Sequence, residues 1–149
     1  TMAVYTVGTV KPVVLEGGAT RTYISVDGGM SDNIRPALYG SDYSASLINR
    51  RSDADPILCR VVGKHCEGGD IVVKDVFLPA DITAGDLIGV PGSGAYCRPM
   101  ASNYNYATKP AVVAVKDGTV RTLLRRETLD DLLELDQGTV VFTLEGLLE

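Results

Sequence analysis

The chain contains 149 residues, of which 45% are hydrophobic and 22% charged, a length and composition typical of one compact domain. A formal net charge of −5 and the lack of any cluster of Lys and Arg argue against a nucleic-acid partner. No apolar run is long enough to span a bilayer, and the first residues do not resemble a signal peptide. The sequence therefore predicts a cytoplasmic protein without a membrane partner.

The cysteines indicate a reducing compartment. Three are present, Cys59, Cys66 and Cys97, and they form neither a C-x-x-C pair nor the Cys/His spacing of a zinc site. Free thiols are therefore expected, and no metal site. Because the first residue is not Met and residues 148–149 are typical of a cloning remnant, we expect an excised domain that covers residues 1–147.

Short runs rich in β-branched residues, separated by Gly and Asp, recur along the chain and predict a β-barrel or sandwich. A hairpin is expected first, with strands at residues 7–14 and 22–26 joined by a Gly-rich turn. Single strands are then predicted at residues 57–62, 71–78 and 86–90.

A second hairpin is predicted near the C-terminal end, from residues 111–116 and 119–126. Asp117 and Gly118 lie between these strands, and an Asp-Gly pair readily adopts the positive φ angles that a two-residue turn needs.

A helix is expected after this hairpin, because Thr128 can cap its first turn together with Asp131. Gly138 would end the helix. One apolar face would be formed by Leu129, Leu132 and Leu133.

Two polar, Gly-rich loops, at residues 27–43 and 92–106, interrupt the strand pattern, and loops on a rigid sheet commonly carry binding residues. In the first loop, Arg35 and Tyr39 stand four residues apart and would share one face of a helical turn. Such an Arg can bind a carboxylate through two N–H groups while the Tyr adds a hydroxyl, as an amino-acid substrate requires. By themselves the residues also fit a solvated Arg and a half-buried Tyr, which is the simpler interpretation.

Residues 61–70 end one strand and begin the next around the sequence G-K-H-C-E-G-G-D. The thiol of Cys66 beside the carboxylate of Glu67 could transfer protons, and the flanking glycines would let a ligand approach the backbone. A tight turn with an inert Cys is the alternative, and it is the simpler one for these residues alone. His65, the only histidine, is expected to pack in the loop rather than act as a base or metal ligand.

Residues 94–105, with the sequence G-A-Y-C-R-P-M-A-S-N-Y-N, follow a strand and can open a short helix. The N-terminal amides of a helix favour an anion such as phosphate, and Tyr96 could reach a cofactor bound there. Tyr, Asn and Ser are also common turn residues, so the segment fits a plain turn as well.

Together these segments resemble the C-terminal part of the diaminopimelate decarboxylase family, fold-type III enzymes that use pyridoxal 5'-phosphate (PLP). The family carries D-G-G-M-S-D-N-x-R-P-x-L-Y, C-E-S-x-D and G-A-Y-x-x-x-M-x-S-N-Y-N in this order, and the similarity runs from Val4 to about Leu135. The resemblance implies an all-β fold, the C-terminal β-barrel of the alanine racemase and decarboxylase type, with short helical inserts that carry binding residues.

The resemblance also implies a role for each motif residue. Arg35 and Tyr39 match the positions that hold the carboxylate of the substrate, and Glu67 matches the Glu that contacts its distal amino group. Cys66 matches the Cys implicated in protonating the carbon that loses CO₂, and Tyr96 matches a Tyr that contacts cofactor and substrate. In the family the Cys-Glu pair reaches into the active site of the other subunit, so a homodimer is implied.

The N-terminal β/α barrel of these enzymes, which carries the PLP-binding Lys and the phosphate loop, has no counterpart here. We therefore expect the chain to be inactive alone, and the whole enzyme to convert meso-diaminopimelate to L-lysine. Two departures from the family pattern affect the expected geometry. Gly68 replaces the Ser of the second motif, which should loosen that turn, and Arg98-Pro99 replaces a smaller polar or aromatic pair.

Two alternatives remain open at this stage. The chain could belong to a related decarboxylase of ornithine, arginine or carboxynorspermidine, although Glu67 favours a substrate with a zwitterionic distal centre over a simple diamine precursor. It could also be a non-catalytic β-domain that only dimerises or binds a partner.

Overall fold

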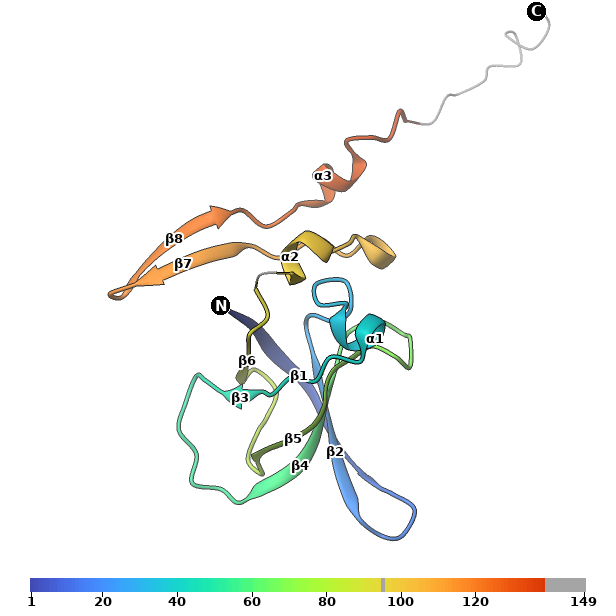
Figure 1. The fold of residues 1–149 in the computed structure, drawn as a ribbon, viewed down its shortest axis with the longest axis vertical. Coiled ribbons are helices and arrows are strands. Elements are labelled where there is room, and N and C mark those ends of the chain that lie inside the picture. Colours follow the sequence, from blue (N-terminus) through green and yellow to red (C-terminus); the bar gives the residue numbers. More distant parts are fainter. Residues whose placement is uncertain (95, 139–149) are drawn as a thin grey trace, which may run out of the picture. The chain divides into compact units, whose positions relative to one another are not determined.

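The computed structural model describes residues 1–94 and 96–138, and strands make up most of its regular structure (Figure 1). It divides into two compact units, residues 1–105 and the residues from 106 on. Each unit contains its own sheet. The predicted domain over residues 1–147 and the predicted remnant at residues 148–149 extend beyond the described residues, and both stay predictions.

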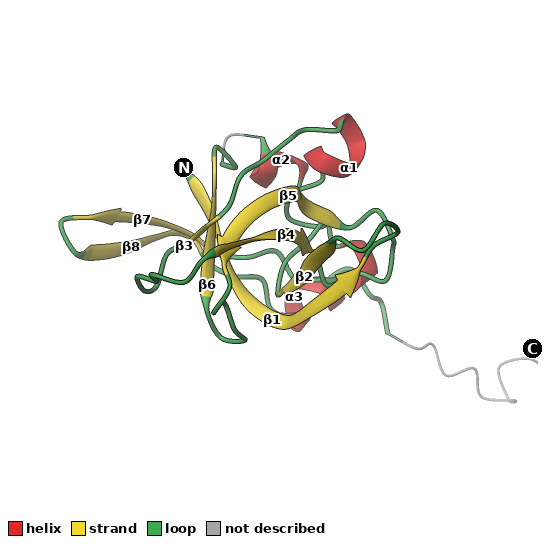
Figure 2. Ribbon diagram, turned by 90° about the horizontal axis from the view of Figure 1, so that it is seen from below, coloured by secondary structure: helices red, strands yellow, loops and turns green. Residues whose placement is uncertain are grey.

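The first unit is a six-stranded sheet in the order β3-β6-β1-β2-β4-β5, which curls into a nearly closed barrel (Figure 2). Neighbouring strands are antiparallel except β2 and β4, which run parallel. This arrangement confirms the predicted all-β barrel. The strands are β1 (Met2–Val14), β2 (Thr20–Val26), β3 (Ser46–Leu47), β4 (Pro56–Val62), β5 (Ile71–Pro79) and β6 (Leu87–Pro91).

The first predicted hairpin is confirmed, but β1 begins five residues earlier than expected because it has two partners. Its residues 2–6 pair with β6, and its residues 10–14 pair with β2. The register shifts between these stretches, where the N–H of Thr9 donates to Oγ of Ser25 over 2.7 Å. Gly8 lies at the shift, and a Cβ there would come within 2.9 Å of the same oxygen.

The core of the first unit is built from side chains that alternate along the strands and face the inside of the barrel. β4, β5 and β6 coincide with the three predicted single strands within one or two residues. β3 is too short for a periodic pattern and was not predicted. The largest fully buried side chains are Ile24, Leu78, Ile88, Val61, Val72, Val73, Val90 and Cys59.

The two predicted polar loops contain single helical turns: α1 (Arg35–Tyr39), α2 (Cys97–Met100) and the 3-10 turn η1 (Tyr104–Tyr106). α1 ends at Gly40, whose φ of 62° suits the left-handed cap of a helix. Pro99 lies in the first turn of α2, where a backbone N–H would have no acceptor within the helix, so its absence costs no hydrogen bond. The Arg98-Pro99 pair is therefore compatible with a helix at this place.

The second unit contains the predicted hairpin of β7 (Val112–Lys116) and β8 (Thr119–Leu124). Asp117 and Gly118 form its turn with φ angles of 49° and 74°, which confirms the predicted turn chemistry. Among the described residues of the chain, no helix is both long and apolar enough to cross a membrane.

The predicted C-terminal helix is present as α3 (Leu129–Leu133), but it is shorter than expected. Thr128 and Asp131 form the predicted capping box. Leu129 and Leu133 are 69% and 55% exposed, so the described residues do not bury the apolar face. A helix without packing stays short, which explains why α3 ends before Gly138.

Arg50 links the segment after β3 to the turn between β5 and β6. Its Nε and Nη2 atoms donate to the two oxygens of Asp86 over 2.9 and 2.8 Å, and its Nη1 atom donates to Asp81 over 2.8 Å. These hydrogen bonds from Arg50 are the main reason that the pKa of Asp86 lies well below its usual value.

We expect the free energy of unfolding to decrease as the pH falls below about 4, the ordinary pKa of Asp. Because the pKa of Asp86 is lower in the folded chain than in the unfolded one, the unfolded state takes up the proton first. The stabilisation is thus present above this pH and is lost as the pH falls towards the folded-state pKa. Urea unfolding across this range should depend less on pH in Asp86→Asn than in the wild type, whereas Asp42→Asn, on an exposed loop, should behave as wild type. Equal slopes in all three proteins would contradict the prediction.

Candidate active site

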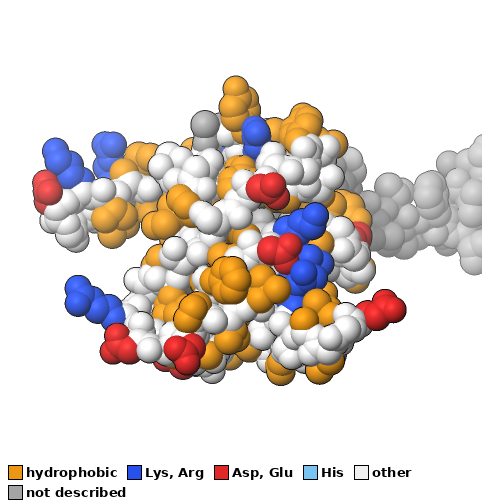
Figure 3. Space-filling model, turned by 60° about the horizontal axis from the view of Figure 1, so that its bottom comes forward, with side chains coloured by type: hydrophobic (Ala, Val, Ile, Leu, Met, Phe, Trp, Pro, Cys, Tyr) orange, Lys and Arg blue, Asp and Glu red, His pale blue; other side chains and the backbone are white. Residues whose placement is uncertain are grey.

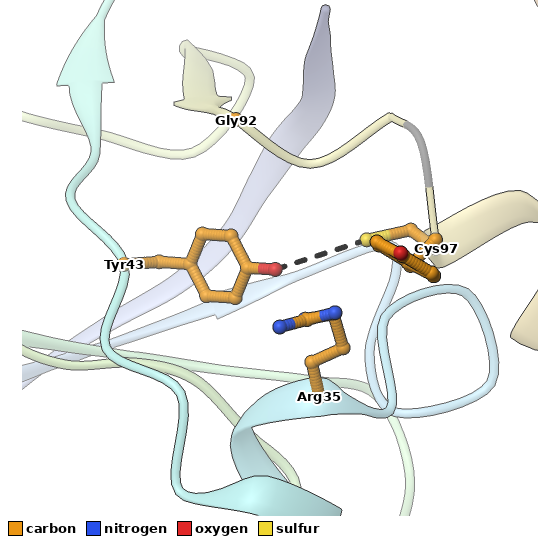
Figure 4. Close-up of a pocket in the computed structure, with 5 residues that line it drawn as sticks. Arg35, Tyr43, Gly92 and Cys97 are labelled. Atoms are coloured by element: carbon orange, nitrogen blue, oxygen red, sulfur yellow. Dashed lines mark hydrogen bonds between the residues drawn. The ribbon is translucent and has the colours of Figure 1, made fainter.

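A pocket of about 170 Å³ lies near the end of β6 and the turns α1 and α2 (Figure 4). It is lined by Arg35, Tyr43, Gly92, Tyr96 and Cys97. The guanidinium carbon of Arg35 lies 5.2 Å from the ring centroid of Tyr96. The pocket therefore combines residues that are about 60 positions apart in the sequence.

Arg35 contacts two aromatic rings, because its guanidinium carbon also lies 5.8 Å from the ring centroid of Tyr39. Contacts of this kind orient an arginine without using its N–H groups. No carboxylate forms a salt bridge with Arg35 in the described part of the chain. Arg35 is partly exposed and lines the pocket, so an anionic ligand can reach its guanidinium.

Tyr43 and Cys97 belong to the same pocket and were not predicted as site residues. Figure 4 shows the hydroxyl of Tyr43 directed at Sγ of Cys97, 4.0 Å away, and beside Arg35. Burial raises the pKa of Cys97, and its thiol donates to Oδ1 of Asn33 over 3.3 Å. Cys97 is thus a neutral structural thiol, and all three cysteines are free, as predicted. No spacing rule links Tyr43 to Arg35, so the sequence contained no usable signal for it.

Cys66 and Glu67 lie on the loop between β4 and β5 and form a second group of polar side chains. The Cys66 thiol lies 3.8 Å from Oε1 of Glu67, and the hydroxyl of Tyr104 donates to the same oxygen over 2.6 Å. The hydrogen bond from Tyr104 is the main cause that lowers the pKa of Glu67. Glu67 is therefore an anion at neutral pH.

His65 has the packing role that the sequence predicts. Its ring meets that of Tyr104 edge to face, with centroids 5.3 Å apart, and its Nε2 atom lies 2.9 Å from Oγ of Ser31. Ser31 also accepts, through its carbonyl, a hydrogen bond of 2.9 Å from the N–H of Ser102. The loop that contains Ser31, the loop that contains His65 and the segment that contains Ser102 therefore meet around Ser31.

Asp70, which is only 3% exposed, fastens two of these segments to each other. Its carboxylate accepts hydrogen bonds from the N–H groups of Met30, over 2.6 Å, and of His65, over 2.8 Å. A Cβ on Gly29 or Gly63 would come within 2.5 or 2.1 Å of this carboxylate. Both positions must therefore be glycine for the two loops to close around Asp70.

The predicted site residues thus form two groups on loops of the first unit. Arg35, Tyr39 and Tyr96 surround one guanidinium, and Cys66 and Glu67 share one hydrogen-bonded oxygen. The catalytic and binding roles predicted for these five residues stay predictions. Their geometry offers a cation for a carboxylate, an anion for an ammonium group and an exposed thiol for proton transfer.

Comparisons with known proteins show the family of the chain. Residues 1–94 match the family described as the pyridoxal-dependent decarboxylase, C-terminal sheet domain. The chain is 57% identical over 136 residues to the diaminopimelate decarboxylase of Mycobacterium tuberculosis H37Rv and 52% identical over 136 residues to that of Corynebacterium efficiens. Each alignment covers 91% of this chain and 30% of the relative, so the chain spans about a third of the curated relatives it matches.

Solved structures show the same similarity. The diaminopimelate decarboxylase of Helicobacter pylori complexed with L-lysine superposes with a TM-score of 0.76 at 33% identity, over 90% of this chain and 31% of that one. The enzyme of M. jannaschii in complex with L-lysine gives 0.82 at 25% identity, over 93% and 30%. An arginine decarboxylase of Paramecium bursaria Chlorella virus, at 19% identity and a TM-score of 0.59, shares the fold alone.

We expect Asp70→Ala to destabilise the chain by about 3 kcal/mol, because two partly buried N–H groups would lose their acceptor. The matched control is Asp75→Ala, which removes a carboxylate from β5, the strand that begins directly after Asp70. Asp75 is 43% exposed and pairs with Arg21 and Arg60, so its loss should cost less than about 1 kcal/mol. Urea denaturation followed by circular dichroism measures both, and equal losses would show that Asp70 does not fasten the loops.

Proposed function

Because the chain belongs to the pyridoxal-dependent decarboxylases as their C-terminal sheet domain, we propose that it completes the active site of a diaminopimelate decarboxylase. The whole enzyme would release CO₂ from meso-2,6-diaminopimelate and form L-lysine, and this domain alone would be inactive. The observation that carries the proposal is the gathering of Arg35, Tyr39 and Tyr96 around one pocket, because such a group suits an amino-acid carboxylate.

Arg35 binds the substrate carboxylate in this proposal. Its planar guanidinium can donate two parallel hydrogen bonds, and the two tyrosine rings restrict its rotation before the substrate arrives. The hydroxyl of Tyr39 adds a third donor from the same helical turn. The contacts of the guanidinium with the two rings limit the entropy that Arg35 loses on binding.

PLP is the cofactor that the proposal requires, and it would be held mainly by a part of the enzyme outside this chain. When bound, it withdraws the electron pair that CO₂ leaves behind. The described residues fit one edge of such a site, since Tyr96 offers an exposed phenol beside Arg35. The described residues that line the pocket include no lysine, so the covalent attachment must come from elsewhere.

Cys66 and Glu67 serve the reacting carbon and the distal end of the substrate. Cys66 is exposed, and its thiol can deliver a proton to the carbon from which CO₂ departs. Glu67 is held as an anion and can accept a hydrogen bond from the distal ammonium group.

A homodimer forms part of the proposal, with Cys66 and Glu67 entering the active site of the partner subunit. Cys66 is exposed on a loop, so its thiol is accessible to a partner subunit, which supports the homodimer. Large apolar side chains are also exposed on the first unit, and Figure 3 shows hydrophobic side chains between charged ones on one face of the molecule. Such surface is commonly covered by another domain or subunit. The exposed apolar residues on the strands of this unit include Met2, Val4, Val14 and Phe77.

The substrate distinguishes this proposal from its main alternative, a decarboxylase of ornithine, arginine or carboxynorspermidine. We expect the whole enzyme, loaded with PLP, to release CO₂ from meso-diaminopimelate at least about 100-fold more efficiently than from ornithine, because the one carboxylate of ornithine leaves as CO₂ and none remains for Arg35 to bind. Trapping of released CO₂ at several concentrations of each compound measures this ratio. A preference for ornithine would overturn the assignment, and no release from any of these amino acids would favour the non-catalytic β-domain.

Replacement of Cys66 by Ala should lower kcat by about 100-fold or more, since general acid catalysis contributes on this scale. PLP binding, followed by the absorbance of the bound cofactor, should stay as in the wild type. Cys59→Ala is the matched control because it removes a buried thiol of β4 that faces the core. If Cys66→Ala turns over like this control, Cys66 has no part in proton delivery.

A further inference from the structure

Tyr104 makes the shortest contact to the carboxylate of Glu67. Its hydroxyl donates to Oε1 over 2.6 Å, and the thiol of Cys66 approaches the same oxygen at 3.8 Å. The other oxygen, Oε2, is shielded from solvent and has no hydrogen-bond partner among the described residues. Oε1 of Glu67 is thus bound by the protein, whereas Oε2 lies beneath the surface without a donor among the described residues.

Tyr104 is itself held in place by a chain of contacts that begins in the protein interior. Ser31 is 5% exposed, and its Oγ lies 2.9 Å from Nε2 of His65. The His65 ring packs against the Tyr104 ring edge to face, with an interplanar angle of 78°. The position of the Tyr104 hydroxyl is therefore tied to a buried residue of the first motif segment, not to solvent.

The backbone next to Tyr104 has an uncommon conformation. Asn105 and Tyr106 have φ angles of 53° and 55°, in the left-handed region that L residues rarely adopt in succession. Such conformations persist where surrounding contacts impose them, and here they directly follow the residue whose hydroxyl binds Glu67.

The electrostatics of the pair are consistent with a fixed donor and a fixed anion. The hydrogen bond from Tyr104 lowers the pKa of Glu67, and the same bond is the main cause that raises the pKa of Tyr104. The titratable side chains that face Glu67 are Tyr104, His65 and Cys66. At neutral pH the phenol keeps its proton and Glu67 keeps its charge.

We propose that Tyr104 is a positioning residue for substrate selectivity, which acts through Glu67 by binding Oε1 and thereby holding the carboxylate in the orientation that receives the distal ammonium group of the substrate. The inference rests on the proposed function, which supplies the ammonium group. Tyr104 itself touches neither substrate nor cofactor in this arrangement. Its removal should therefore weaken substrate binding more than it slows the chemical step.

The test uses the whole enzyme with PLP bound and compares Tyr104→Phe with Tyr23→Phe, which makes the same chemical change on β2. Tyr104→Phe should raise KM for meso-diaminopimelate about tenfold and change kcat less than about twofold. Calorimetry should show a similar loss of affinity for L-lysine, a readout that needs no turnover. The acid limb of kcat/KM should also move to higher pH, because Glu67 loses the hydrogen bond that lowers its pKa. The Tyr23→Phe enzyme should match the wild type in all four.

A double-mutant comparison separates this role from general support of the loop. If Tyr104 acts through Glu67, then Tyr104→Phe should add little to the KM increase of Glu67→Gln. The inference would be overturned if the KM increases of the two single variants multiplied in the double variant. An unchanged KM in Tyr104→Phe, or a loss confined to kcat, would overturn it as well. Failure of the wild-type enzyme to release CO₂ from meso-diaminopimelate would instead overturn the proposed function, so the two failures are distinguishable.

Discussion

The buried carboxylate of Asp70 is the constraint on which the arrangement of the site depends. It joins the N–H of Met30, in the segment that leads to Arg35, to the N–H of His65, which precedes Cys66. A carboxylate removed from water is stable only when its oxygens are hydrogen-bonded, so it holds both loops at a fixed distance from each other. One buried residue thus ties the segment before the guanidinium to the segment before the Cys-Glu pair.

Local chemistry explains why most strands and turns could be predicted from the sequence. The Asp117-Gly118 turn and the capping box of Thr128 depend only on residues within a few positions, and both are present. The early start of β1 depends on its pairing with β6, some 80 residues away, and periodicity cannot reveal such a partner. The short α3 likewise has leucines that no described residue buries, whereas the pattern of leucines reports only the capacity to pack.

In the site as well, residues linked by short spacing or by motifs could be predicted, and residues linked only by long-range contacts could not. Arg35 and Tyr39 could be paired from their spacing, and the resemblance of three ordered motifs added Tyr96, Cys66 and Glu67. The contact between Tyr104 and Glu67 spans 37 positions, and no single-sequence rule connects a phenol to a carboxylate over that distance. The role of Gly29 and Gly63 was hidden for the same reason, since their need for space comes from Asp70 and not from a turn.

Gly68 illustrates how the structure changes the meaning of a departure from a motif. A Ser is expected at this position, and its loss suggested a looser turn after Glu67. A Cβ at Gly68 would meet no atom within 4 Å, so the backbone conformation here does not depend on having glycine. The loop is fixed instead on either side, by the carboxylate of Asp70 accepting from His65 and by the hydroxyl of Tyr104 holding Glu67. The orientation of the Cys-Glu pair therefore rests on contacts from distant segments, and a hydroxyl at position 68 is not needed to explain it.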